Sequence, residues 1–181
     1  MITNILIVIA GLFACIIVVG IFIPRAYRFH KTIVIKADKK HIFNTIDNLS
    51  TWKIWSQWSP ERDPTIVLTY SDETQGKESW MEWKGKKMGA GKMEISATDP
   101  YREIHIQSAF NKGLFKMEFT FTLEEIKEEH YAVKWTVSGL TKRGGFAKIL
   151  GRMLPKMMGK DMEIALKLLQ AYCEGKLSST N

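Results

Sequence analysis

The chain has 181 residues, of which 45% are hydrophobic, so it is long enough for one globular domain with a substantial core. Its formal net charge of +7 at pH 7 favours anionic partners, but no nucleic-acid recognition motif accompanies the charge, and nucleic acid is not expected as a partner. The two cysteines, Cys15 and Cys173, leave no disulfide to be expected within one domain, which excludes a secreted disulfide scaffold.

The chain opens with an apolar stretch from Ile5 to Ile23 that carries no charged residue. About 19 residues give roughly 28 Å of helix, close to the roughly 30 Å hydrocarbon core of a bilayer, so this stretch predicts a transmembrane helix. A cleaved signal peptide and lipidation at Cys15 are the alternatives, although no basic segment precedes the stretch. Arg25, Arg28 and Lys31 follow it and no Lys or Arg precedes it, which predicts a single-pass membrane protein with its folded domain in the cytoplasm.

The folded domain is predicted to begin with a strand and two short helices. Phe29 to Ala37 is rich in alternating β-branched residues, which is typical of a strand. Asp38 can cap a helix over Lys39 to Asp47, and Ser50 to Trp55 predicts a second helix or a single turn. Three tryptophans spaced three residues apart either pack the short helices against a sheet or line the mouth of a pocket: Trp52, Trp55 and Trp58.

Six further segments have the length and composition of strands, and turn-forming residues separate them. They run over Thr65–Tyr70, Ser79–Lys84, Gly91–Thr98, Arg102–Phe110, Phe115–Glu124 and Tyr131–Gly139. Apolar and polar residues alternate most clearly from Phe115 to Glu124, so we expect one apolar and one polar face. Trp80 and Trp83 fall on opposite faces of their strand, and the sequence leaves open which of them faces inward.

A long helix is predicted from Gly145 to Glu174, because apolar residues recur there every three or four positions. Pro155 lacks an amide hydrogen and its ring clashes with the carbonyl four residues earlier, so we expect a kink or a break at this position. Basic residues recur every fourth position on a second stripe, which is either a solvated face or a contact surface for anionic membrane headgroups. This basic stripe consists of Lys148, Arg152, Lys156 and Lys160.

The order of the elements, strand, two helices, six strands and long helix, predicts an α+β fold. A seven-stranded curved antiparallel sheet must cover its single apolar face, and the terminal helix is the only long amphipathic element left for it to wrap around. Such a sheet leaves a cavity between itself and the helix, and this cavity suits an apolar ligand. The alternative is a solid core, filled by the methionines of the terminal helix. The side chains expected at the cavity and its rim are Phe119, Trp135, Met157, Met158, Trp55 and Phe110. The chain would then divide into an anchor and its flank over residues 1–27, one domain over 28–176 and a disordered tail over 177–181.

Several short motifs occur in an order that is typical of one known superfamily. They are Ile35 with the following helix start, Trp52, Trp55 and Trp58 with Asp63 and Pro64, Trp83 with Gly85, Gly89 and Gly91, Asp99 with Pro100, Trp135 with Gly139, and Gly159 to Glu163 with Leu166 and Leu169. On these residues the chain from about Arg28 to Glu174 resembles the SRPBCC superfamily (START-like, helix-grip fold), in its polyketide cyclase/dehydrase-like branch. Met162 and Ala165 stand where that family often has Phe and Gly. The resemblance implies a helix-grip fold with a pocket for a hydrophobic ligand, and it fixes no catalytic residues.

Two functions remain open. The first is a membrane-tethered protein that binds a hydrophobic small molecule or lipid in the cavity, with the ligand and the membrane as its partners. The alternative is a polyketide cyclase/dehydratase-like enzyme with an acid/base pair in the same cavity, for which Asp161 and Glu82 are the candidates. No cofactor is expected and no obligate protein partner is evident. The four histidines show no metal-ligand spacing with one another or with cysteine, so no metal site is expected.

Overall fold

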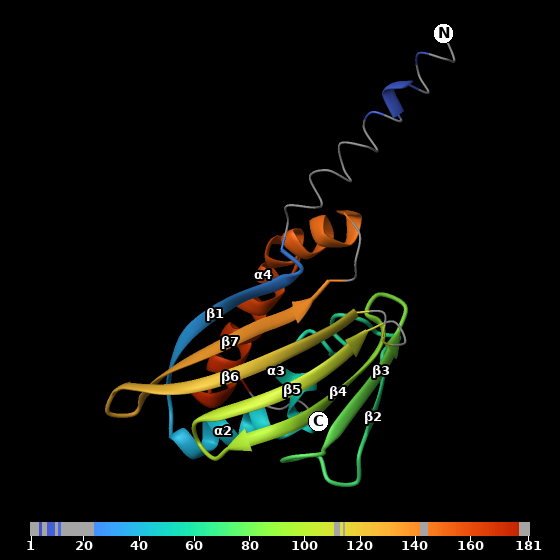
Figure 1. Cartoon of the computed structure of the whole chain (residues 1–181). Coiled ribbons are helices and arrows are strands. Elements are labelled where there is room, and N and C mark those ends of the chain that lie inside the picture. The colour runs from blue at the N-terminus through green and yellow to red at the C-terminus, as the bar shows by residue number, and fades with distance from the viewer. Residues whose placement is uncertain are drawn as a thin grey trace.

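The sheet is the largest element of the molecule. The computed structural model describes residues 24–110, 113, 115–141 and 145–177, together with residues 4, 7–9 and 11. Within these residues seven strands form one antiparallel sheet in the order β1-β7-β6-β5-β4-β3-β2 (Figure 1). The strands are β1 (Ala26–Lys36), β2 (Val67–Tyr70), β3 (Trp80–Gly85), β4 (Gly89–Asp99), β5 (Glu103–Phe110), β6 (Phe115–Lys127) and β7 (His130–Leu140). The strands β2 to β7 therefore form the predicted meander, and β1 pairs with its last strand.

The helices occupy the positions that the sequence predicts. They are α2 (Lys39–Asp47), the single 3-10 turn η1 (Leu49–Thr51), α3 (Trp52–Trp55) and α4 (Gly145–Cys173). Asp38 caps α2, because its Oδ1 accepts a hydrogen bond from the amide of His41 at 3.0 Å. Asn48 caps η1 in the same way through the amide of Ser50 at 3.0 Å. Figure 1 shows α2, α3 and α4 on one side of the sheet.

The long helix α4 runs without interruption through Pro155. Of the kink or break expected at this residue, the break does not occur. Figure 1 instead shows the orange first part of α4 and its red second part running in different directions, which is the bend that a proline inside a helix produces.

The inner face of the sheet, the one covered by the helices, is apolar as predicted. The alternating residues Phe119, Phe121 and Leu123 of β6 are all buried, and so are Val133, Trp135 and Val137 of β7. They pack with the tryptophans of the α3 region and with the second half of α4. Trp83 is 2% exposed and belongs to this core, whereas Trp80 lies on the opposite, outer face. The question that the sequence left open is thus answered in favour of Trp83.

The predicted transmembrane helix over residues 5–23 falls almost entirely outside the described residues, and so do residues 178–181 of the predicted tail. Among the residues that the structure does describe, no helix is both long enough and apolar enough to cross a bilayer. The only long helix among the described residues is α4. It carries charged side chains along its length, including Arg152, Lys160 and Glu163. On this finding the predicted location as a single-pass membrane protein with a cytoplasmic domain is wrong.

Candidate functional site

The candidate site is the aromatic interior between the inner face of the sheet and the helices. Its centre is Phe119, which is fully buried on β6. The ring of Trp135 on β7 lies edge-on to it, with 5.6 Å between the ring centroids. The ring of Trp58, in the loop after α3, lies 6.3 Å from Phe119. These separations are typical of aromatic pairs that attract one another through their quadrupoles as well as through buried area.

The loop that carries Trp58 is held by a buried carboxylate. Asp63 is 1% exposed and accepts hydrogen bonds from the amides of Lys87 (2.8 Å) and Met88 (3.0 Å), in the turn between β3 and β4. It also accepts from the amide of Thr65 at 3.0 Å and from its hydroxyl at 2.6 Å, and the bond from that hydroxyl is the largest cause that holds the pKa of Asp63 well below its ordinary value. A side chain at Gly85 would overlap this carboxylate. The glycine therefore lets the loop and the turn come together, and this fixes Trp58 over the sheet.

The interior tryptophans differ in whether their indole N–H groups have a hydrogen-bond acceptor. The Nε1 atom of Trp52 donates to the carbonyl of Ile46 at 2.9 Å. The Nε1 atom of Trp55 donates to the hydroxyl of Thr51 at 3.3 Å, and that of Trp83 donates to the carbonyl of Met88 at 3.3 Å. By contrast, the Nε1 atoms of Trp58 and Trp135 are buried and have no hydrogen-bond partner among the described residues.

A third polar group on the inner face is also left without a partner. Ser108 is 3% exposed, and its hydroxyl finds no acceptor or donor in the described part of the chain. Ser108 pairs with Met117 across β5 and β6, while Ile106 pairs with Phe119, so Ser108 is a diagonal neighbour of Phe119 on the same face. We call Trp58 Nε1, Trp135 Nε1 and Ser108 Oγ the unpartnered donors. All three belong to residues that surround Phe119.

The unpartnered donors decide what the interior can do chemically. More than nine in ten buried polar groups in proteins are hydrogen-bonded, and leaving one unsatisfied costs about 1–3 kcal/mol. The indole N–H can only donate, and the serine hydroxyl can donate as well as accept. The interior therefore holds three buried groups that can each donate a hydrogen bond to a ligand, and its remaining surface is aromatic and aliphatic.

The predicted ligand-contacting residues divide into three groups. Trp55, Phe119 and Trp135 are at most 1% exposed in the interior. Phe110 and Met158 are half-buried and pack against the core, and Phe110 contacts the ring of Trp83 at 5.2 Å. Met157 is 56% exposed, so its expected inward position is wrong. The reason is helical geometry, since consecutive residues point about 100° apart and only Met158 continues the buried stripe of α4.

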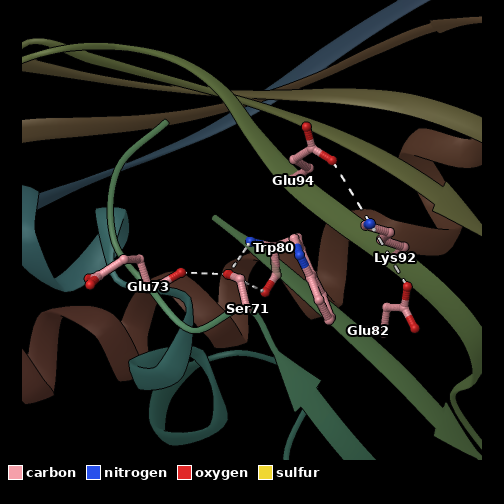
Figure 2. Close-up of polar contacts among 6 residues, drawn as sticks. All are labelled: Ser71, Glu73, Trp80, Glu82, Lys92 and Glu94. Carbon is pink, nitrogen blue, oxygen red and sulfur yellow. Dashed lines mark hydrogen bonds and ion pairs between the residues drawn. The ribbon is translucent and has the colours of Figure 1, made fainter. Parts of the chain in front are cut away.

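The two predicted acid/base candidates lie away from the interior. Glu82 projects from the outer face of β3, and its carboxylate is 3.9 Å from the ammonium of Lys92, which is also 4.0 Å from Glu94 (Figure 2). The same ammonium sits 4.7 Å above the ring of Trp80, in a cation–π contact. The carboxylate of Asp161 is 3.6 Å from the guanidinium of Arg62, and both side chains are more than 40% exposed. Neither carboxylate therefore reaches the interior, and these residues give no support to the enzymatic alternative.

The outer face of the sheet has two open hollows. One, of about 600 Å³, and another, of about 650 Å³, share Lys92 and Ala109 in their walls. Charged side chains of both signs line them, among them Glu82, Glu94 and Lys116. Both hollows are open, unlike the enclosed pockets that bury most of the surface of a small apolar ligand. In the described residues no group of three His, Cys, Asp or Glu side chains gathers closely enough to hold a metal ion.

The predicted basic stripe is divided by the structure. Lys148 and Arg152 line a pocket beside the start of β1, together with Arg25 and Arg28. Lys156 and Lys160 are exposed and do not line it. From the sequence, Arg25 and Arg28 were expected only to orient the chain in a membrane, and nothing in the local pattern links them to α4.

Two residues of the interior were missed as site residues in the sequence analysis. Trp58 was expected, with Trp52 and Trp55, either to pack the short helices or to line the mouth of a pocket, because a loop position does not reveal where its side chain points. Ser108 left a signal that could have been used: it is the single polar residue in the inward series Ile104, Ile106, Ser108 and Phe110. A lone polar residue at an apolar position of a strand is a reasonable marker of a binding site.

No family model matches the sequence, and no curated protein matches it either. Solved structures do match it. Protein CV1439 from Chromobacterium violaceum is 16% identical, with 83% of this chain and 97% of that chain covered and a TM-score of 0.58. The Aha1 dimer from Colwellia psychrerythraea is 17% identical over 83% and 98% of the two chains, with a TM-score of 0.55. CalU16 from Micromonospora echinospora is 14% identical over 85% and 78%, with a TM-score of 0.54. At these identities the likeness shows the fold alone, and that fold is the helix-grip fold, a curved antiparallel sheet with a long C-terminal helix.

Proposed function

We propose that this protein binds a hydrophobic small molecule or lipid in its aromatic interior, and that the molecule carries a neutral oxygen that accepts hydrogen bonds. The observation that carries the proposal is the pair of buried indole N–H groups of Trp58 and Trp135, which have no partner in the described residues and belong to rings that both lie beside Phe119. The helix-grip fold supports it, because that fold places an apolar sheet face around one helix.

The chemistry of the ligand follows from its surroundings. A charged group of the ligand would lose its hydration in this interior. Among the described residues that are buried around Phe119, no charged side chain is present to pair with it. A carbonyl, ether or hydroxyl oxygen could instead accept from the unpartnered donors and remove their desolvation cost. A ketone, ester or alcohol with a hydrocarbon body should therefore bind better than the hydrocarbon alone.

Room for the ligand comes from side chains that can move. Met117 and Met158 are half-buried and pack at the edge of the core. Their unbranched side chains have three rotatable bonds and can adopt new positions at low cost, unlike the rings of Phe119 and Trp135. We therefore propose that the ligand enters the interior past these two methionines and past Phe110, whose ring is also half-buried.

The test is displacement of Nile red, a neutral dye that fluoresces in apolar sites, from the full-length chain. Decan-2-one and decane are compared as competitors at equal saturation of the aqueous phase. The ketone should displace the dye with at least about fivefold higher affinity, since a good hydrogen bond between buried groups is worth about 1 kcal/mol or more. Trp135→Phe removes one unpartnered donor and should reduce this preference.

Trp80→Phe is the matched control, because Trp80 is on the outer face and its substitution leaves the interior intact. It should leave the preference for the ketone unchanged. Absence of dye binding by the wild-type chain, or equal displacement by decane and decan-2-one, would contradict the proposal.

A further inference from the structure

A second pocket lies between the start of β1 and the first half of α4. Its volume is about 300 Å³, and it is separate from the aromatic interior. Four of its lining side chains are cationic, and among the described residues no carboxylate lines it. These four are Arg25, Arg28, Lys148 and Arg152. We call it the arginine pocket.

The first wall of the arginine pocket is fixed by the pairing of the sheet edge. The amide of Thr141 donates to the carbonyl of Arg25 at 2.9 Å, and the Nε of Arg25 donates to the carbonyl of Thr141 at 3.1 Å. The first bond continues the ladder of β1 and β7 beyond the last strand pair, Ala26 and Leu140. The second holds the guanidinium of Arg25 by its Nε, and no bond from its two terminal nitrogens to a described residue is found.

The second wall is a face of α4. Lys148, Gly151, Arg152 and Pro155 follow the spacing that places helical residues on one side. A side chain at Gly151 would overlap the methyl group of Thr141, so the glycine allows α4 to come close to the end of β7. This close approach brings Lys148 and Arg152 to the same pocket as the residues of β1. Two pairs of cations from distant parts of the sequence are thereby gathered around one space.

Two of the four cations of this pocket have no carboxylate partner within the described chain. Arg28 and Arg152 form no ion pair with any described carboxylate. The acidic residues of α4 are engaged elsewhere, since Glu163 pairs with Lys31 and Asp161 pairs with Arg62. The first half of α4 also carries the positive end of the helix dipole. Like charges held together around a cavity repel one another, and an anion bound among them relieves this repulsion.

We propose that the arginine pocket binds the phosphate group of a phosphate monoester. A phosphate monoester carries a charge of about −1.5 to −2 at pH 7 and three acceptor oxygens, which fits several cations better than the single charge of a carboxylate. Guanidinium groups are suited to it because they donate two parallel hydrogen bonds to neighbouring oxygens. Since a water molecule occupies about 30 Å³ of liquid, the pocket can hold a phosphate and part of the group that it is attached to.

The test is calorimetric titration of the full-length chain with inorganic phosphate and with acetate, at constant ionic strength. Phosphate should bind and acetate should bind at least about tenfold more weakly. Arg28→Gln and Arg152→Gln should each weaken phosphate binding by about tenfold. Lys156→Gln is the control, because it removes the same charge from an exposed position of the same helix that does not line the pocket, and it should weaken binding by less than about twofold.

Thermal melting of each variant shows whether it is folded, and the exposed positions of Arg28 and Arg152 predict wild-type melting curves. Equal weakening by the three substitutions would show a diffuse positive field and would overturn the proposal. The absence of phosphate binding up to about 10 mM would overturn it too, because the affinity would then be too weak for a site.

Two sources of the phosphate are distinguished by two further ligands. Glycerol 3-phosphate is the soluble monoester, and phosphatidic acid in phosphatidylcholine vesicles presents the same group on a lipid. If Arg152→Gln weakens the binding of either ligand about tenfold and Lys156→Gln does not, the result supports the arginine pocket. The ligand that binds more tightly then identifies the source of the phosphate. Binding of vesicles that is equally reduced by Lys156→Gln contradicts a pocket and indicates attraction to a charged surface.

Discussion

The two halves of α4 have the same kind of sequence and different surroundings. In the second half, five residues of the apolar stripe are at most 7% exposed: Met162, Ala165, Leu166, Leu169 and Cys173. In the first half, Met153 is 50% exposed and Met157 is 56% exposed. The second half is also tied to β1, because Gln170 donates through Nε2 to the carbonyl of Val34 at 2.8 Å. The difference teaches that the second half of α4 closes the core, while the first half contacts the fold through Gly151 and keeps much of its apolar stripe exposed.

The largest expected effect is on the free energy of unfolding, when one apolar side chain in each half of α4 is replaced by alanine. Leu169→Ala removes a fully buried side chain and should lower the free energy of unfolding by about 2–5 kcal/mol, because the cavity it leaves can relax only in part. Met157→Ala, in the exposed half, should change it by less than about 0.5 kcal/mol. Denaturant unfolding followed by circular dichroism measures both values. Similar losses for the two variants would mean that the halves do not differ.

A second prediction sharpens the contrast within the core. Trp52→Phe and Trp135→Phe remove the same atoms from buried rings. Only the first breaks a hydrogen bond, the one to the carbonyl of Ile46, whereas the second removes a donor that has no partner in the described chain. We expect Trp52→Phe to be more destabilising by about 1 kcal/mol. The reverse order in denaturant unfolding would show that the Nε1 atom of Trp135 is already satisfied in the folded protein.

The smallest expected effect depends on pH. The carboxylate of Glu163 on α4 pairs with the ammonium of Lys31 on β1, and the hydrogen bond from Lys31 lowers its pKa below the ordinary value of 4.5. Because the folded pKa is the lower one, the pair contributes its stability above about pH 4.5 and loses it as the pH falls through the folded value. Both groups are exposed, so the contribution is small and is screened by salt.

Glu163→Gln measures this contribution. Thermal melting at pH 7 and at pH 3, in low salt, should show a slightly less stable variant at pH 7 and a smaller difference from wild type at pH 3. A deficit that is unchanged at pH 3, or that is the same in high salt, would rule out the ion pair as its cause.

The elements of the fold could be predicted from the sequence because each has its own period. Alternation over residues 115–124 located β6 and its buried face, and Asp38 marked the start of α2. The bend at Pro155 followed from the missing amide, although the helix continues where a break was also expected. These are local properties of the chain.

The site depends on contacts that no local pattern contains. Met157 and Met158 are neighbours in an apolar helix, and only the packed structure shows that the second of them faces the core. Arg28 and Arg152 line the same pocket only because α4 lies against β1, and this is a tertiary contact. The state of each indole N–H depends on which acceptor, a carbonyl or a hydroxyl, lies next to it in the folded chain. For this reason the paired and unpartnered tryptophans could not be separated by sequence.

The central claim is that the interior binds an oxygen-bearing apolar molecule through Trp58 and Trp135. The most direct measurement is the amide and indole N–H spectrum of the full-length chain labelled with ¹⁵N-tryptophan, recorded while decan-2-one is added. The indole resonances of Trp58 and Trp135 should move to lower field, as N–H groups do when they gain an acceptor, and those of Trp52, Trp55 and Trp83 should stay in place. Movement of none of the six indole resonances, or equal movement of all of them, would contradict the claim.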